Sequence, residues 1–209
     1  MCSVEGGKLG NLAGAGPMGR GARTYALHCD RRTGMIVVTV IDQERLDRAK
    51  HLFPIEEAAA DGIELHFVNT GGMDDPAASL RAISGGDGFD DVFCYAPIAS
   101  VVELSSAVLG RDGCLNFFAG PTDKQFRANM NFYAVHYNST HLISTTRDNP
   151  ASKNVSLPLT AANRILPAHT VTPLGGPYSA PQTTLKLTPT PATPTLLSTH
   201  LRPPTPPRT

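Results

Sequence analysis

The chain has 209 residues, of which 41% are hydrophobic, and its 18 basic side chains are balanced by 18 acidic ones. This length accommodates one packed domain with an extension, or two small domains. No run of about 18 apolar residues is present, so no membrane-spanning helix is expected, and the first 30 residues lack the apolar segment behind positive charge that is typical of a secretory signal. We therefore expect a cytoplasmic protein without a membrane partner.

The distributions of cysteine and charge argue against further classes of protein. The four cysteines lie far apart and form no CxxC pair, which disfavours a zinc knuckle and a disulfide framework. All 18 acidic residues precede residue 149, whereas residues 149–209 hold five basic residues and no acidic one. Five charges over that length are too dilute to predict a nucleic-acid partner. The asymmetry indicates instead that the sequence changes character near residue 148.

Short apolar runs alternate with amphipathic stretches between residues 8 and 146. Helical patterns run over 17–32 and 43–53, begin at the cap Asp75–Pro76, and repeat apolar residues at Val101, Leu104 and Val108. This alternation predicts an α/β fold with a doubly wound parallel six-stranded sheet. The predicted strands are Leu9–Ala13, Met35–Val40, Leu65–Val68, Val92–Ala96, Cys114–Ala119 and His141–Thr145.

The apolar spacing of the first helix predicts which of its sides faces the sheet. Its inner face is expected to consist of Met18, Ala22, Tyr25 and Cys29, and its outer face to carry Arg20, His28 and Arg31. On this assignment, the side chain of Arg20, which directly follows Gly19, points to solvent.

The chain loses its periodicity after residue 146. Residues 147–159 show no clear pattern, and one short helix is expected over Thr160–Leu166, ended by Pro167. Residues 181–209 include 8 prolines and 9 threonines, a composition that cannot build a core and predicts a disordered tail. We therefore divide the chain into a domain at 1–146, a degenerate segment at 147–180 and a Pro/Thr-rich tail at 181–209.

One motif carries chemistry. Gly14-Ala15-Gly16-Pro17-Met18-Gly19 has the form GxGxxG and lies between a predicted strand and an amphipathic helix. Gly14 allows a tight turn, Gly16 lets a pyrophosphate approach the backbone, and Gly19 lets the helix pack closely on the sheet. The helix N-terminus offers free N–H groups and a partial positive charge to the phosphates. The motif therefore predicts dinucleotide binding; the alternative is an ordinary strand–turn–helix junction.

A mononucleotide phosphate loop is excluded by the next residues. Arg20-Gly21 stands where that loop requires Lys followed by Ser or Thr. No lysine there reaches a terminal phosphate, and no hydroxyl holds magnesium.

The residue that binds ribose is expected near the end of the second strand, about 20 residues beyond the glycines. Asp42 follows this strand and is either a ribose ligand or the N-cap of the helix that begins at Gln43. Arg45, in the first turn of that helix, is either a contact for a 2′-phosphate or an exposed surface residue.

The remaining candidate polar residues, two histidines and a pair of aspartates, are expected to have structural roles. His136 and His141 have no cysteine or acid at ligand spacing, so they are expected to be packing or surface histidines rather than zinc ligands. Asp90-Asp91 is expected to be a turn and cap before the fourth strand rather than a catalytic pair. No catalytic and no metal-binding residue is predicted.

Taken together, the stretch from Gly6 to Thr146 resembles the cofactor domain of zinc-type medium-chain alcohol and polyol dehydrogenases. The resemblance rests on the GAGPMG loop, on Ile36-Val37-Val38-Thr39 followed by Glu44–Lys50, and on three longer segments. The longer segments are similar to L-sorbose-1-phosphate reductase-like members and run over Gly88–Phe93, Leu109–Asp123 and Asn131–His141.

This resemblance implies a Rossmann fold, a nicotinamide cofactor (NAD or NADP) and hydride exchange between a secondary alcohol and a ketone. The pyrophosphate would be held by Gly14, Gly16, Pro17, Met18 and Gly19. Ala96-Pro97 and Ala119-Gly120, just past the fourth and fifth strands, would line the crevice for adenosine and nicotinamide.

The sequence departs from the family in three places. Val40 aligns with the family's ribose-binding aspartate, and losing that contact typically costs about 1.5–3 kcal/mol, a roughly ten- to hundredfold weakening. Only 13 residues precede the glycine loop, where the family has its catalytic zinc domain. Arg147-Asp148-Asn149-Pro150 replaces a glycine-rich loop, and the Pro/Thr tail replaces an ordered ending. These departures predict a truncated copy without zinc.

The leading hypothesis is therefore the NAD(P)-binding portion of a polyol dehydrogenase, inactive alone and served by a separate zinc-domain chain. The alternatives are a non-enzymatic interaction module and a non-functional gene fragment.

Overall fold

The computed structural model describes residues 5–144, 150–170, 174–175 and 198–199. Six strands form one sheet in the order β3-β2-β1-β4-β5-β6, and every adjacent pair is parallel. The predicted doubly wound α/β sheet is thereby confirmed. The strands are β1 (Lys8–Leu12), β2 (Met35–Val40), β3 (Glu64–Asn69), β4 (Phe89–Cys94), β5 (Leu109–Phe117) and β6 (His141–Ile143).

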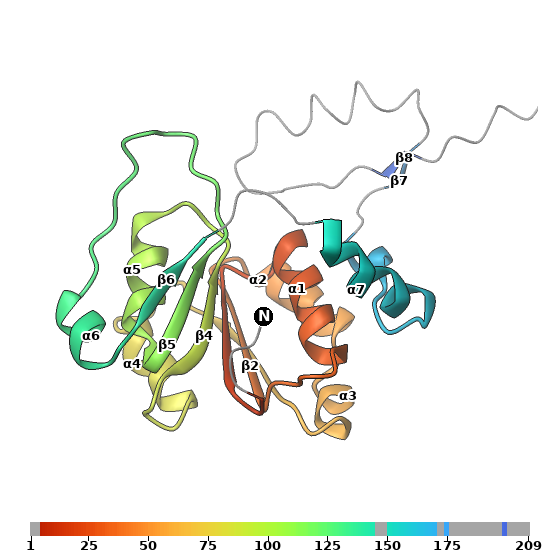
Figure 1. The fold of residues 1–209 in the computed structure, drawn as a ribbon, viewed down its shortest axis with the longest axis horizontal. Helices are drawn as coiled ribbons and strands as arrows, with labels where there is room; N and C mark the ends of the chain where they lie inside the picture. Colours follow the sequence, from red (N-terminus) through yellow and green to blue (C-terminus); the bar gives the residue numbers. More distant parts are fainter. Residues whose placement is uncertain (1–4, 145–149, 171–173, 176–197, 200–209) are drawn as a thin grey trace, which may run out of the picture.

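Helices cover the two faces of this sheet (Figure 1). One core joins the sheet to α4 and α5 through Leu80 and Val102, and another joins it to α1 and α3 through Leu27 and Ala58. The helices are α1 (Pro17–His28), α2 (Gln43–Leu52), α3 (Ile55–Ala60), α4 (Pro76–Ile83), α5 (Ala99–Ala107), α6 (Phe132–Tyr137) and α7 (Pro150–Ala161), with a 3-10 turn at Pro167–Thr170.

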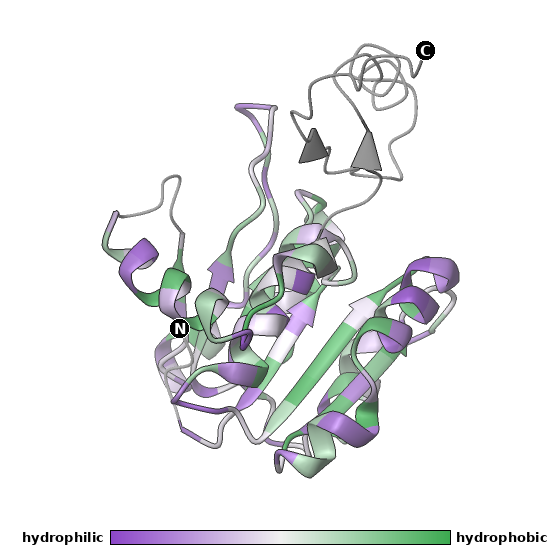
Figure 2. Cartoon of the chain, turned by 90° about the vertical axis from the view of Figure 1, so that its right-hand side faces the viewer, coloured by the Kyte–Doolittle hydropathy of each residue, from purple (hydrophilic) through white to green (hydrophobic). Residues whose placement is uncertain are grey.

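Strand β2 forms where the sequence is almost continuously apolar. All six residues of β2, MIVVTV, are buried, as expected for a central parallel strand that is covered on both faces. In Figure 2 the central strands are strongly hydrophobic, whereas the outer surfaces of the helices are largely hydrophilic. Helices α1, α2, α4 and α5 each contribute buried apolar residues to the core.

Polar caps set the starts of α2 and α4. The Asp42 carboxylate accepts a hydrogen bond from the Arg45 N–H at 3.1 Å, and Asp75 accepts one from the Ala78 N–H at 2.9 Å. Pro76 occupies the first turn of α4, where its missing N–H costs nothing. The predicted Asp75–Pro76 start is confirmed.

The predicted orientation of α1 was wrong. Met18 is 53% exposed, whereas Arg20 is 4% and Arg23 0% exposed. Gly19 fixes this rotation, because a Cβ there would lie 2.1 Å from the Gly14 carbonyl oxygen. The side of α1 that carries Gly19 and Arg23 therefore faces inward, and Met18 is turned outward.

Three other local expectations also need correction. Asp90 and Asp91 lie within β4, where Asp90 accepts a hydrogen bond from the Lys8 N–H at 2.7 Å. A twelve-residue helix, α7, forms at Pro150–Ala161 despite its internal Pro158, and the helix expected over Thr160–Leu166 is wrong. None of the residues in α7 is buried, so it lacks the apolar period from which it could be predicted.

The remaining features concern the ends of the molecule. Leu174–Gly175 (β7) pairs in parallel with Ser198–Thr199 (β8). Apart from β8, the predicted tail at 181–209 lies outside the described residues, as do Arg147, Asp148 and Asn149. Within the described ranges, no helix is long and apolar enough to cross a membrane.

Candidate functional site

The candidate site lies where the carboxyl ends of the central strands meet the glycine turn. The Gly14 N–H donates to the Thr39 carbonyl at 3.0 Å, and the Ala13 N–H donates to the Thr39 hydroxyl at 3.2 Å. On the other side, the Tyr95 N–H donates to the Leu12 carbonyl at 3.1 Å. The turn is thus attached to both β2 and β4, at the point where the strand order reverses between β1 and β4. In sheets of this type, ligands bind in the crevice at that point.

The three glycines have different surroundings. A Cβ on Gly14 would lie 2.7 Å from the Asn11 carbonyl oxygen, and one on Gly19 would collide with the backbone of Gly14. A Cβ on Gly16 would meet no atom within 4 Å. Gly14 and Gly19 are therefore required by packing, whereas the space beside Gly16 is open.

The N-terminus of α1 is open to an anion. Gly16 is its N-cap and supplies no side-chain hydrogen bond, and no acidic residue lies in the first turn. Pro17 has no N–H, so the free donors of this turn are those of Met18 and Gly19. N–H groups without an intrahelical partner and the helix dipole suit a phosphate.

Asp42 and Arg45 lie beside this turn at the end of β2. The hydrogen bond to the Arg45 N–H shows that Asp42 caps α2, so the cap alternative is confirmed; a ribose contact stays a prediction. The Arg45 Nε atom is 3.4 Å from the second carboxylate oxygen of Asp42. The carboxylate is therefore partly engaged by its own helix.

Val40, the last residue of β2, is a buried apolar residue beside the glycine turn. Its side chain is 9% exposed and belongs to a small core cluster with Ala15, Leu46 and Ala49. The side chain of the last residue of β2 consequently offers no hydrogen-bond acceptor to a ribose, and its backbone carbonyl already accepts from the Thr70 N–H at 3.1 Å.

The other predicted residues line the same edge of the sheet. Backbone N–H groups of Phe118 and Ala119 both donate to the Cys94 carbonyl at 3.1 Å, which brings the chain past β5 next to the chain past β4. Ala119 is buried, whereas Pro97 and Gly120 are exposed. Ala96-Pro97 and Ala119-Gly120 thus lie side by side near the crevice.

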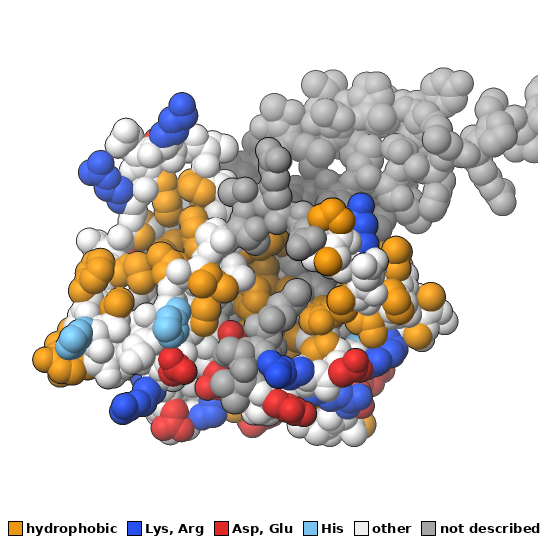
Figure 3. All heavy atoms as spheres, in the orientation of Figure 1, with side chains coloured by type: hydrophobic (Ala, Val, Ile, Leu, Met, Phe, Trp, Pro, Cys, Tyr) orange, Lys and Arg blue, Asp and Glu red, His pale blue; other side chains and the backbone are white. Residues whose placement is uncertain are grey.

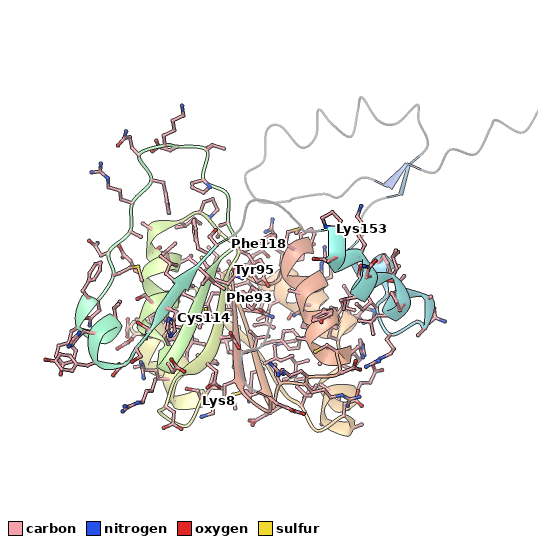
Figure 4. The ribbon with its side chains drawn as sticks, in the orientation of Figure 1. Lys8, Phe93, Tyr95, Cys114, Phe118 and Lys153 are labelled. Atoms are coloured by element: carbon pink, nitrogen blue, oxygen red, sulfur yellow. The ribbon has the colours of Figure 1, made fainter. Side chains whose placement is uncertain are left out.

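Two aromatic residues here were missed by the sequence analysis. Tyr95 and Phe118 lie just past β4 and β5 with ring centroids 5.9 Å apart, and Phe93 stacks on Tyr95 at 6.1 Å. Figure 4 shows these three toward the carboxyl end of the sheet, with Lys8 at the opposite end. The sequence does not reveal them as site residues, because each falls within an apolar run that was expected to be a buried strand.

Two buried arginines were also missed. The guanidinium of Arg23 lies over the Phe53 and Phe67 rings, at 4.3 and 5.4 Å from their centroids, and its nitrogens have no hydrogen-bond partner. Burial lowers the pKa of Arg23 to about 9. Burial also lowers the pKa of Arg20, helped by the nearby charges of Arg48 and Arg45. The only signal for Arg20 is its position directly after Gly19.

The histidines form no metal centre in the part of the chain that the structure describes. His141 is exposed and contacts Asp112 at 3.0 Å, and His136 lies edge-on against Tyr137. Across the described ranges, no group of three or more His, Cys, Asp or Glu side chains is arranged to hold a metal.

A separate hollow of about 410 Å³ lies between α1 and α7, at the end of α1 away from the glycine turn. Figure 3 shows charged side chains along the edge where the strands begin and apolar ones above them. The residues of this hollow include no cluster of reactive groups; they are Tyr25, Cys29, Asp30, Asn154, Val155, Pro158, Leu159, Ala162 and Arg164.

Comparison with known proteins extends this picture. The chain is 47% identical over 197 residues to mannitol-1-phosphate 5-dehydrogenase of Aliivibrio fischeri, which covers 94% of this chain and 47% of the relative. It is 40% identical over 176 residues to L-sorbose 1-phosphate reductase of Klebsiella pneumoniae, covering 84% of this chain and 42% of that protein. An uncharacterised Escherichia coli protein, YggP, is 47% identical over 182 residues. The chain thus spans less than half the length of these relatives. No protein-family model matches it.

Solved structures share the fold at low sequence identity. The 2R,3R-butanediol dehydrogenase of Bacillus subtilis superposes with a TM-score of 0.71 at 16% identity, over 88% of this chain and 48% of that one. An alcohol dehydrogenase from Escherichia coli CFT073, solved with the cofactor NADH, gives a TM-score of 0.69 at 14% identity, over 93% of this chain and 52% of that one. The expected resemblance to part of these enzymes is confirmed.

Proposed function

Because this chain is homologous to one part of zinc-type polyol dehydrogenases, we propose that it binds a nicotinamide dinucleotide and presents it for hydride transfer. The substrate of the whole enzyme would be a secondary alcohol or the ketone of a sugar phosphate. The part that corresponds to this chain supplies cofactor binding, and the reacting alcohol would be activated elsewhere.

The open space beside Gly16 is the observation that carries this proposal. It lies at the uncapped N-terminus of a twelve-residue helix, with no atom within 4 Å of the position of a Cβ. A pyrophosphate requires such backbone access together with free N–H donors. An ordinary strand–turn–helix junction needs the close packing of Gly14 and Gly19 but gives no reason for a bare Gly16.

The two halves of the dinucleotide would lie on either side of this turn. The adenosine ribose would lie beside Val40 and Asp42 at the end of β2, and the nicotinamide would lie near Ala96-Pro97 and Ala119-Gly120. When bound, the nicotinamide ring accepts or donates the hydride. Tyr95 and Phe118, whose rings are tilted against each other, would shield that side of the crevice from water.

Catalysis by the proposed enzyme would also need a group that stabilises the alkoxide. In this class of enzyme a zinc ion acts as the Lewis acid and is held by three protein ligands. The residues that the structure describes offer no such cluster. We therefore propose that the zinc site belongs to the portion of the relatives that this chain does not match, supplied by a second polypeptide or region. This chain alone is then expected to bind cofactor without turnover.

A non-enzymatic interaction module is the second candidate, and exposed aromatic residues on α6 favour it. Phe132, Tyr133 and Tyr137 are 76%, 69% and 60% exposed, and none of the six residues of α6 is buried. Apolar surface of this kind is unusual without a partner. The exposed aromatic surface of α6 also agrees with the proposed cofactor-binding function, if the partner that covers it carries the zinc site.

Calorimetric titration of the chain with NADH and NADPH tests the proposed function. Saturable heat, with a dissociation constant below about 1 mM, supports it. Absence of heat from both dinucleotides up to millimolar concentration contradicts it and leaves the interaction module as the better explanation.

A further inference from the structure

Three arginines on α1 and α2 interact electrostatically. Arg20 projects from the first turn of α1, and Arg45 and Arg48 belong to α2. Their charges are close enough that Arg48 and Arg45 both contribute to the lowered pKa of Arg20, after burial itself. Arginine stays protonated at neutral pH, so this corner of the site is positively charged.

Two of these arginines have donors that the protein does not use. The Nε atom of Arg20, whose side chain is nine-tenths buried, has no hydrogen-bond partner, and neither does the buried Nη2 atom of Arg45. A buried donor without an acceptor costs free energy, and native structures contain few of them. The Nε atom of Arg45 lies 3.4 Å from Asp42, so only one side of that guanidinium is paired. An anionic ligand beside these arginines would supply the missing acceptors.

The position that decides between the two nicotinamide cofactors is apolar. An acid at the end of β2 holds the ribose hydroxyls of NAD and repels the 2′-phosphate of NADP, whereas an arginine nearby accommodates that phosphate. Val40 ends β2 and is packed against Ala15 and Leu46. Asp42 follows two residues later, but it caps α2 and contacts Arg45.

We propose that the cofactor of this chain is NADP(H), with the 2′-phosphate held between Arg45 and Arg20 and with Arg48 adding to the local positive charge. This inference rests on the proposed function. Arginine pairs with phosphate through two parallel N–H donors, which would satisfy the unused donors of Arg45 and Arg20. The open backbone at Gly16 would hold the pyrophosphate of the same molecule, since Thr39 links the glycine turn to the end of β2.

The test is calorimetry on the full chain with NADPH and NADH, and with the fragments 2′,5′-ADP and 5′-AMP. We expect NADPH to bind at least about tenfold more tightly than NADH, and 2′,5′-ADP more tightly than 5′-AMP. The difference should shrink as salt is raised, because screening weakens exposed charge pairs. Inorganic phosphate is added as a competitor to show whether the cluster binds any phosphate or needs the attached nucleotide.

Arg45→Met is the decisive variant, because the cap uses only the backbone N–H of residue 45. It should weaken NADPH binding about tenfold and leave NADH binding unchanged. Arg111→Met is the matched control, since Arg111 is exposed near the start of β5, at the opposite edge of the sheet. Equal affinities for both dinucleotides, tighter NADH binding, or an Arg45→Met variant that weakens both equally would overturn this inference while the proposed function stands. If neither NADPH nor NADH binds, this inference and the proposed function are both overturned.

Discussion

The glycine turn offers a pair of substitutions that separates cofactor binding from folding. Gly16→Ala and Gly19→Ala add the same methyl group three residues apart. At Gly16 the new Cβ enters open space, whereas at Gly19 it meets the Gly14 carbonyl oxygen at 2.1 Å and the Gly14 Cα at 2.6 Å. The first change is expected to impair binding with little effect on stability, and the second to impair stability.

The magnitudes follow from the local geometry. Gly16 has φ −74° and ψ 175°, which alanine adopts without strain. Loss of a glycine N-cap and the smaller entropy of the unfolded alanine chain oppose each other at about 0.5–1 kcal/mol each, so stability should change by less than about 0.5 kcal/mol. At Gly19 the clash is with backbone, and overpacking of this kind costs about 1–3 kcal/mol, which lowers Tm by about 2–12 °C in a chain of this size.

Thermal unfolding and calorimetric titration of both variants are the assays. Gly16→Ala should keep its Tm within about 2 °C and bind the dinucleotide at least about tenfold more weakly, because its methyl group takes the space of the pyrophosphate. A Gly16→Ala variant that binds like the unmodified chain would refute the placement of the pyrophosphate. A Gly19→Ala variant with an unchanged Tm would refute the close packing of α1 on the turn.

Three further predictions concern single side chains. Val40→Asp should tighten NADH binding about ten- to hundredfold by supplying the missing ribose acceptor, at some cost in stability because Val40 is buried; an unchanged dissociation constant defeats it. Asp42→Asn should preserve the cap of α2 and hence Tm, since Asn caps as well as Asp, whereas Asp42→Ala should lose about 1 kcal/mol in urea unfolding; equal losses would argue against the cap. Arg23→Met should raise the free energy of unfolding by about 1–2 kcal/mol at pH 7, because it removes a buried charge without hydrogen-bond partners. The pKa of Arg23 is about 9 in the folded state, which is below its unfolded value, so the folded state releases the proton at lower pH. The stability advantage of the variant should therefore shrink as the pH rises through about 9. An advantage that is constant from about pH 7 to 10 would contradict a buried charge as its cause.

Local patterns predicted the central part of the fold well. The run MIVVTV is buried throughout as β2, and the Asp75–Pro76 start of α4 is confirmed, because burial on both faces and N-capping each leave a direct mark on the residues concerned. Helix α7 was not predicted. None of its residues is buried, so its sequence does not show the regular spacing of apolar residues by which a core-facing helix is recognised.

The site was only partly predictable for a related reason. The GxGxxG spacing located the turn, but the role of Asp42 stayed open until its hydrogen bond to the Arg45 N–H was seen. Arg20 was assigned to the solvent side, since a helical pattern of apolar residues alone favours Met18 as the buried residue. Burial of an arginine depends on what the neighbouring helix presents, which no local pattern contains.

The sequence by itself determined that apolar strands alternate with helices and that a bare glycine turn joins the first pair, because these properties depend on residues that are close together in the chain. The tertiary structure alone decided how α1 is rotated and which charges meet at the end of β2. Contact between Gly19 and Gly14 turns Arg20 inward, where the charges of Arg45 and Arg48 on α2 contribute to its lowered pKa. Such an arrangement is set by the docking of separate elements, so the positively charged corner emerges only when the chain is folded.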